Sequence, residues 1–124
     1  MPKPGHTGLA RIVKAFRFSV LGFRSAWRYE SAFRQECLLA IILVPCAFLL
    51  AETYTQAALL IAATGLVLVA ELLNSAVEAV VDRIGEEHHQ LAGRAKDMGS
   101  AAVFVSLVIV VVTWSLVAID RFLA

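Results

Sequence analysis

Charged side chains are scarce in this sequence of 124 residues. Only 17% of the residues are Asp, Glu, Lys or Arg, 60% are hydrophobic, and the formal net charge is +1. Soluble domains carry about 25% charged residues, and disordered chains or nucleic-acid-binding domains carry a clear excess of one sign. The composition therefore excludes these classes and predicts a membrane-inserted protein with no nucleic acid among its partners.

Cysteine and proline are also rare, at two and three residues. Cys37 and Cys46 are nine positions apart, roughly 13 Å along one helix axis, so they cannot pair within a chain. A secreted fold held by disulfides is therefore excluded, and no Cys/His spacing predicts a zinc site. Pro45 lies inside an apolar run, where membrane helices tolerate proline.

Long uncharged runs are what the sequence has in abundance, at residues 37–51, 53–70 and 98–119. A membrane-spanning helix needs about 20 residues, which the third run supplies alone and the others reach by extension. We predict an all-α integral membrane protein with a single domain over residues 1–124. Its parts are an amphipathic surface helix at 6–34, spans at 35–51, 53–81 and 98–119, and a loop at 82–97.

Basic residues indicate the orientation of these spans. Residues 1–35 carry seven Lys or Arg and one acid, the loop 82–97 carries three basic residues, and the turn 52–56 carries none. Because Lys and Arg concentrate in cytoplasmic loops, we expect a cytoplasmic N-terminus and a periplasmic C-terminus in a bacterial inner membrane. Within 6–34, apolar residues recur every three or four positions between the cations, which is typical of a helix on the membrane surface. A plain anchor has the same pattern.

A polar stripe interrupts the second span. Its members share one helix face by their spacing: Glu71, Asn74, Ser75, Glu78 and Asp82. Ionisable groups inside a membrane are costly and usually mark a site, although a structural hydrogen-bond seam between helices is the alternative. Glu71 and Glu78 are about 10 Å apart along the axis, too far to bind the same ion. Glu71, deeper in the membrane, suits a general base, and Glu78 suits a metal ion.

Other charged residues gather at the same membrane face. Glu30 either pairs with Arg34 at i+4 or completes a magnesium site with Glu78. Arg94 and Lys96 could neutralise phosphate charge, although a cytoplasmic loop would carry such residues under the positive-inside rule anyway. The loop lacks a G-x-x-x-x-G-K-[ST] motif, and the protein-kinase motifs are absent, so a soluble-kinase fold is excluded.

Four sequence blocks resemble the bacterial integral-membrane diacylglycerol kinase family. They are Arg-Ile-Val-Lys-Ala at 11–15, Phe-Arg-Gln-Glu at 33–36, the acidic helix at 71–85, and Gly-Arg-Ala-Lys-Asp-Met-Gly-Ser-Ala-Ala at 93–102. The match runs nearly end to end. The resemblance implies a homotrimer with active sites shared between subunits, and transfer of the ATP γ-phosphate to 1,2-diacylglycerol to give phosphatidate, with Mg²⁺.

The resemblance also assigns residues. Glu71 would accept the proton, with Asn74 supporting it, and Glu30 and Glu78 would bind Mg²⁺. The nucleotide-binding residues would be Arg11, Phe18, Glu30, Glu78, Glu87, His88, His89, Lys96 and Asp97. The lipid-site residues would be Arg11, Ala15, Phe16, Arg17, Phe18, Ser19, Val20, Phe33, Arg34, Gln35, Glu36, Glu71 and Ser100.

Three positions depart from the pattern of the family, which often has aromatic residues where this chain has Val20 and His88, and a tyrosine at Phe18. A hydroxyl hydrogen bond from position 18 is therefore excluded. A related undecaprenol kinase shares the acids and the architecture. A small proton-coupled transporter or a non-catalytic scaffold are further alternatives, but the polar stripe at one membrane face argues against both.

Overall fold

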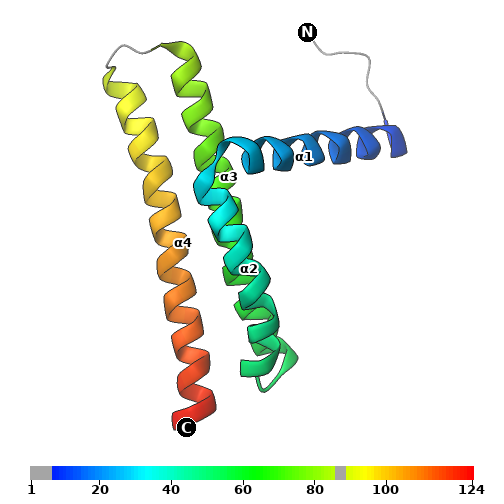
Figure 1. The fold of residues 1–124 in the computed structure, drawn as a ribbon, viewed down its shortest axis with the longest axis vertical. Coiled ribbons are helices and arrows are strands. Elements are labelled where there is room, and N and C mark those ends of the chain that lie inside the picture. The colour runs from blue at the N-terminus through cyan, green and yellow to red at the C-terminus, as the bar shows by residue number, and fades with distance from the viewer. Residues whose placement is uncertain (1–6, 86–88) are drawn as a thin grey trace.

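The computed structural model describes residues 7–85 and 89–124, and these residues form four helices (Figure 1). They are α1 (Leu9–Tyr29), α2 (Ser31–Leu50), α3 (Tyr54–Ile84) and α4 (Gln90–Leu123). The predicted all-α fold is confirmed for the described residues. Helices α2, α3 and α4 run alongside one another, whereas α1 leaves the bundle sideways.

Three helices, α2, α3 and α4, are long and apolar enough to cross a membrane. With 31 and 34 residues, α3 and α4 are about 46 and 51 Å long, longer than the roughly 30 Å hydrocarbon core of a bilayer. The sequence predicts a loop over 82–97, but α3 continues to Ile84 and α4 begins at Gln90. His89 caps α4, because its Nδ1 accepts a hydrogen bond from the Leu91 backbone N–H at 3.0 Å.

The corner between α1 and α2 is a single residue. The sequence predicts one helix over 6–34, but α1 ends at Tyr29 and Glu30 has an extended backbone. Arg34 Nη1 donates hydrogen bonds to the carbonyl oxygens of Trp27 at 2.7 Å and Arg28 at 3.3 Å. These carbonyls belong to the last turn of α1, which has no further intrahelical donors. The first turn of α2 therefore holds the end of α1.

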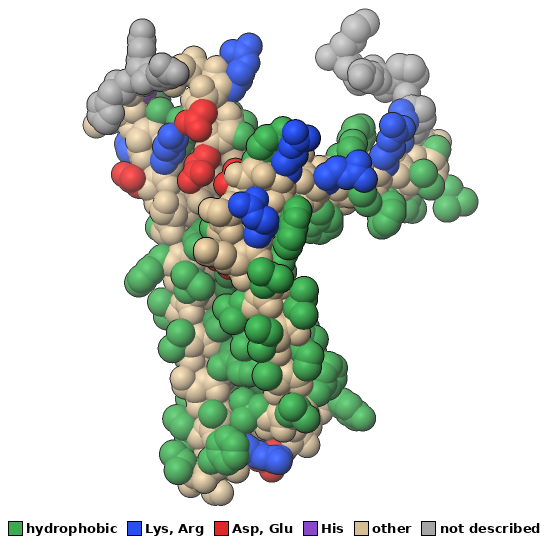
Figure 2. All heavy atoms as spheres, viewed as in Figure 1, with side chains coloured by type: hydrophobic (Ala, Val, Ile, Leu, Met, Phe, Trp, Pro, Cys, Tyr) green, Lys and Arg blue, Asp and Glu red, His purple; other side chains and the backbone are tan. Residues whose placement is uncertain are grey.

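Helix α3 lies at the centre of the packing and contacts both α2 and α4 extensively. Small residues let the backbones of packed membrane helices approach closely, and Ala57, Ala63 and Ala70 are all buried on α3. At the end of the bundle far from α1, Leu60 is fully buried against Ala47 and Val117. Figure 2 shows the charged side chains gathered mainly around α1 and the adjoining helix ends, above a largely hydrophobic shaft.

Candidate active site

The polar stripe of α3 lies near the corner between α1 and α2. Glu71 is only 6% exposed, and it is the one acid among the described residues that is buried. The carboxylates of Glu36, Glu78 and Glu30 repel that of Glu71, so residues from the start of α2 and the stripe of α3 share one electrostatic environment. Three of the predicted acids thus act electrostatically on the one buried carboxylate, that of Glu71.

Asn74 is directed toward Glu78. Its Nδ2 donates a hydrogen bond to Glu78 Oε1 at 3.3 Å, and no described hydrogen bond joins Asn74 to Glu71. Asn74 Oδ1, Ser75 Oγ and Glu36 Oε2 are buried without a hydrogen-bond partner among the described residues. Buried polar atoms normally have partners, so this cluster has unused hydrogen-bonding capacity among the described residues.

Glu30 and Arg34 do not form the ion pair that their spacing allows. The Arg34 guanidinium donates instead to the carbonyl oxygens at the end of α1, and no Glu30–Arg34 ion pair is found in the described part of the chain. The Glu30 side chain is half-buried and interacts electrostatically with Glu71. The structure therefore gives no support to the intrahelical pair and places the Glu30 carboxylate within electrostatic range of Glu71.

The donor set fits magnesium. Among residues 7–85 and 89–124, no group of three or more His, Cys, Asp or Glu side chains is placed to hold a metal ion. Magnesium, however, is usually bound through one or two carboxylates, with phosphate oxygens and water completing its shell. Glu78 is half-buried, and the Asn74 amide donates a hydrogen bond to only one of the two carboxylate oxygens of Glu78, Oε1. Half-buried carboxylates such as those of Glu30 and Glu78 are therefore the type of ligand that this ion takes together with a nucleotide.

Lys96 and Asp82 form an ion pair that the sequence did not identify. Lys96 Nζ lies 2.8 Å from Asp82 Oδ1 and also interacts electrostatically with Glu78. The side chains are 45% and 67% exposed, so the pair adds little stability. Its effect is to place an ammonium group from α4 beside the acids of α3. Asp82 belongs to the predicted stripe, but its partner Lys96 becomes apparent only from the way α4 lies alongside α3.

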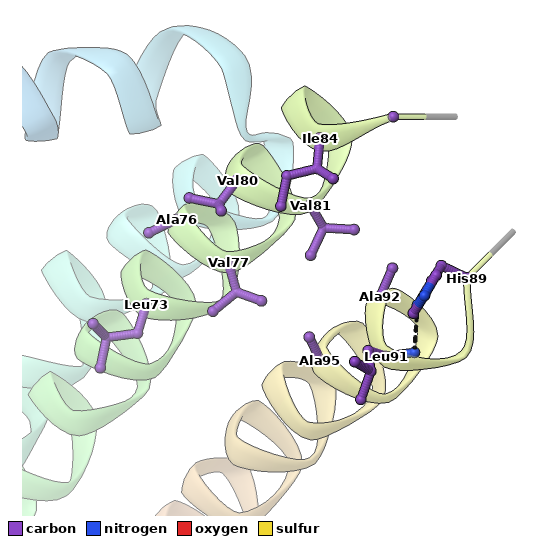
Figure 3. Close-up of a pocket in the computed structure, with 11 residues that line it drawn as sticks. Leu73, Ala76, Val77, Val80, Val81, Ile84, His89, Leu91, Ala92 and Ala95 are labelled. Atoms are coloured by element: carbon purple, nitrogen blue, oxygen red, sulfur yellow. Dashed lines mark hydrogen bonds between the residues drawn. The ribbon is translucent and has the colours of Figure 1, made fainter. Parts of the chain in front are cut away.

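An apolar groove of about 1190 Å³ separates the facing ends of α3 and α4 (Figure 3). It is lined mainly by aliphatic side chains of α3, among them Val77, Val80 and Ile84, and no acid of residues 7–85 or 89–124 lines it. His89 lines this groove and its hydrogen bond to Leu91 closes the first turn of α4. The predicted nucleotide contacts Glu87 and His88 lie outside the described residues.

The predicted site residues of α1 are remote from the acids of the same chain. Arg11 lies 19 residues before Glu30, which corresponds to about 28 Å along a helix, and α1 packs mainly against α2. The side chains of the 15–20 stretch are exposed, Phe18 at 67%. Phe33, by contrast, is buried at the start of α2, and Ser100 and Asp97 are exposed on α4. One chain therefore assembles the α2, α3 and α4 part of the site, but not the α1 part.

Comparison with known proteins gives a consistent result. The family model for prokaryotic diacylglycerol kinase matches residues 17–118. Two diacylglycerol kinases are 53% identical to the chain. The one from Haemophilus influenzae matches over 87% of this chain and 92% of its own length, and the one from Pseudomonas aeruginosa over 92% and 93%. The diacylglycerol kinase of Escherichia coli is 48% identical over 94% of this chain and 95% of its own length.

Proposed function

The chain belongs to the prokaryotic diacylglycerol kinase family and is a lipid kinase, and we propose that it transfers the γ-phosphate of ATP to the free hydroxyl of 1,2-diacylglycerol, giving phosphatidate and ADP. The observation that carries the proposal is the division between two acids on one face of α3. Glu71 is buried, whereas Glu78, two turns nearer the helix end, is half-exposed and hydrogen-bonded by Asn74.

Phosphoryl transfer requires mainly alignment and charge neutralisation. Glu30 and Glu78 would hold Mg²⁺, which when bound offsets phosphate charge. Lys96, which the ion pair with Asp82 keeps beside Glu78, would contact the phosphates. Glu71 would accept the proton of the lipid hydroxyl. The oxygen of that hydroxyl forms a bond to the γ-phosphorus while the bond between the γ-phosphorus and the ADP oxygen breaks. The proton then leaves to solvent.

The location of α1 supports a site shared between subunits. The predicted contacts on α1 lie up to about 28 Å from the acids of their own chain, and α1 points away from them. We propose that α1 of a neighbouring subunit supplies Arg11 and the 15–20 stretch, within a homotrimer. The nine spanning helices of a trimer would then enclose an active site, which the three helices of one subunit are too few to surround.

The charge distribution supports the membrane placement. Charged side chains gather at the α1 end of the bundle (Figure 2), and Leu9, Ile12 and Phe16 of α1 are exposed. We propose that α1 lies on the cytoplasmic face of the bacterial inner membrane with its apolar side chains in lipid and its cations at the headgroups. The ends of α3 and α4 then stand where ATP arrives, and the C-terminus is periplasmic.

The substrate is tested by label transfer. Purified protein in mixed micelles receives γ-labelled ATP, Mg²⁺ and either 1,2-diacylglycerol or undecaprenol, and the labelled lipid is identified by chromatography. We expect label in phosphatidate. Label in undecaprenyl phosphate alone would mean that the substrate is the polyprenol and would refute diacylglycerol as the substrate. Label in neither lipid would refute the lipid-kinase proposal.

A further inference from the structure

Gly99 lies against Asn74 where α4 packs on α3. A Cβ atom at position 99 would meet Asn74 Oδ1 far inside van der Waals contact, and Asn74 Cγ at 3.3 Å. At Gly22, Gly65 and Gly93, by contrast, an added Cβ would meet nothing within 4 Å. The missing side chain of Gly99 therefore provides the space that the Asn74 carboxamide occupies.

Few interactions hold that carboxamide in place. Its Nδ2 has the hydrogen bond to Glu78 Oε1, and its Oδ1 is buried without a partner among the described residues. An obstacle at position 99 would press on the end of a rotatable side chain, while Asn74 Cα, at 3.7 Å, is in ordinary contact. The carboxamide would consequently rotate away before the two helices separate.

We propose that Gly99 is a positioning residue for Glu78, acting through Asn74. The space above Gly99 lets the carboxamide face Glu78 and engage Oε1, which leaves the second oxygen of that carboxylate for a cation. This inference rests on the proposed function, in which Glu78 binds Mg²⁺. If the inference holds, α4 helps to align the Glu78 carboxylate through Gly99, a residue that has no side chain.

The first test observes the carboxamide directly. Asn74 is the only asparagine in the chain, so selective labelling with side-chain ¹⁵N asparagine gives a single pair of carboxamide NMR signals in micelles. We expect Gly99→Ala to shift these signals, and Gly93→Ala, on the same helix, to leave them in place. Unshifted signals in Gly99→Ala would overturn the proposal. This result is independent of whether any lipid is phosphorylated.

The second test uses turnover and the Mg²⁺ requirement. Small misplacements of reacting groups cost on the order of 10²-fold in rate, so we expect Gly99→Ala to lower kcat by roughly 10- to 100-fold. It should also raise the Mg²⁺ concentration for half-maximal activity, with an unchanged melting temperature and KM for lipid. A melting temperature that falls while the Mg²⁺ requirement stays constant would mean a merely structural contact, and would overturn the proposal.

A double variant provides the decisive comparison. In the Asn74→Ala background, a methyl group at position 99 no longer meets the carboxamide. Gly99→Ala should therefore add no further loss to that of Asn74→Ala, whereas multiplying losses would refute action through Asn74. Should Gly99→Ala alone fail to fold, recovery of folding in the double variant supports the contact. Failure of the double variant as well would overturn it.

Discussion

Replacing Glu71 with glutamine removes the proposed proton acceptor while preserving the shape of a buried side chain. Glu71 is 6% exposed, and glutamine has nearly the same volume, so the packing of α3 should be retained. The change also removes one charge from a group of mutually repelling carboxylates. We therefore expect Glu71→Gln to assemble and melt like the parent protein, or at a slightly higher temperature.

The loss should fall on the chemical step. A positioned general base contributes about 10²- to 10⁴-fold to a rate, which at 1.36 kcal/mol per tenfold corresponds to a barrier increase of about 3–5 kcal/mol. Glu71 and Glu78 are seven residues apart, about 10 Å along α3. The hydrogen bond from Asn74 to Glu78 is therefore undisturbed, and nucleotide binding should not change. We expect kcat to fall by 10²- to 10⁴-fold with KM for ATP unaltered.

The assay is the initial rate of phosphatidate formation from γ-labelled ATP in mixed micelles, at several ATP concentrations. Glu52→Gln is the matched control, because Glu52 is an exposed acid in the turn before α3, at the opposite end of the bundle. It should retain the parental kcat and KM. A Glu71→Gln variant with a loss below tenfold, or with a loss expressed mainly in KM for ATP, would refute the assignment of Glu71 as the proton acceptor.

Three further predictions concern other parts of the chain. Glu78→Gln should raise the Mg²⁺ concentration for half-maximal activity, and an unchanged requirement, measured by metal titration, would count against Glu78 as a ligand. Asp82→Asn should raise KM for ATP with little change in melting temperature, because the exposed pair with Lys96 orients more than it stabilises; a parental KM would contradict this. Leu60→Ala should lower the free energy of unfolding by about 2–5 kcal/mol without changing either KM, which thermal denaturation and kinetics check together.

The number and order of the helices could be predicted from the sequence, but not all of their ends. Long apolar runs identify spanning helices by length alone. Residues 82–97 are polar, and a polar segment beside a membrane is equally compatible with a loop or with a helix continuing into water. In the structure both helices continue into this segment, α3 to Ile84 and α4 from Gln90. No periodicity in the polar segment distinguishes these outcomes.

Only the part of the site that lies on a single helix could be predicted from the sequence. Helical spacing places Glu71, Asn74 and Glu78 on one face; in the structure Asn74 donates a hydrogen bond to Glu78, and the carboxylates of Glu78 and Glu71 repel each other. The contact of Gly99 with Asn74 and the Lys96–Asp82 pair join two helices, and their formation depends on how far α4 slides along α3. That register is decided by packing along both helices, which spacing within one helix does not encode.

The sideways course of α1 bears on which measure of concentration sets the rate for each of the two substrates. If α1 lies on the membrane surface, as proposed, a diacylglycerol molecule would reach Glu71 by diffusing within the leaflet, whereas ATP would arrive from bulk water at the ends of α3 and α4. The rate would then depend on the mole fraction of diacylglycerol in the membrane and on the molar concentration of ATP. Diluting a vesicle suspension at fixed ATP and fixed lipid composition would leave the turnover of each enzyme unchanged. The enzyme would sense one substrate per unit of area and the other per unit of volume.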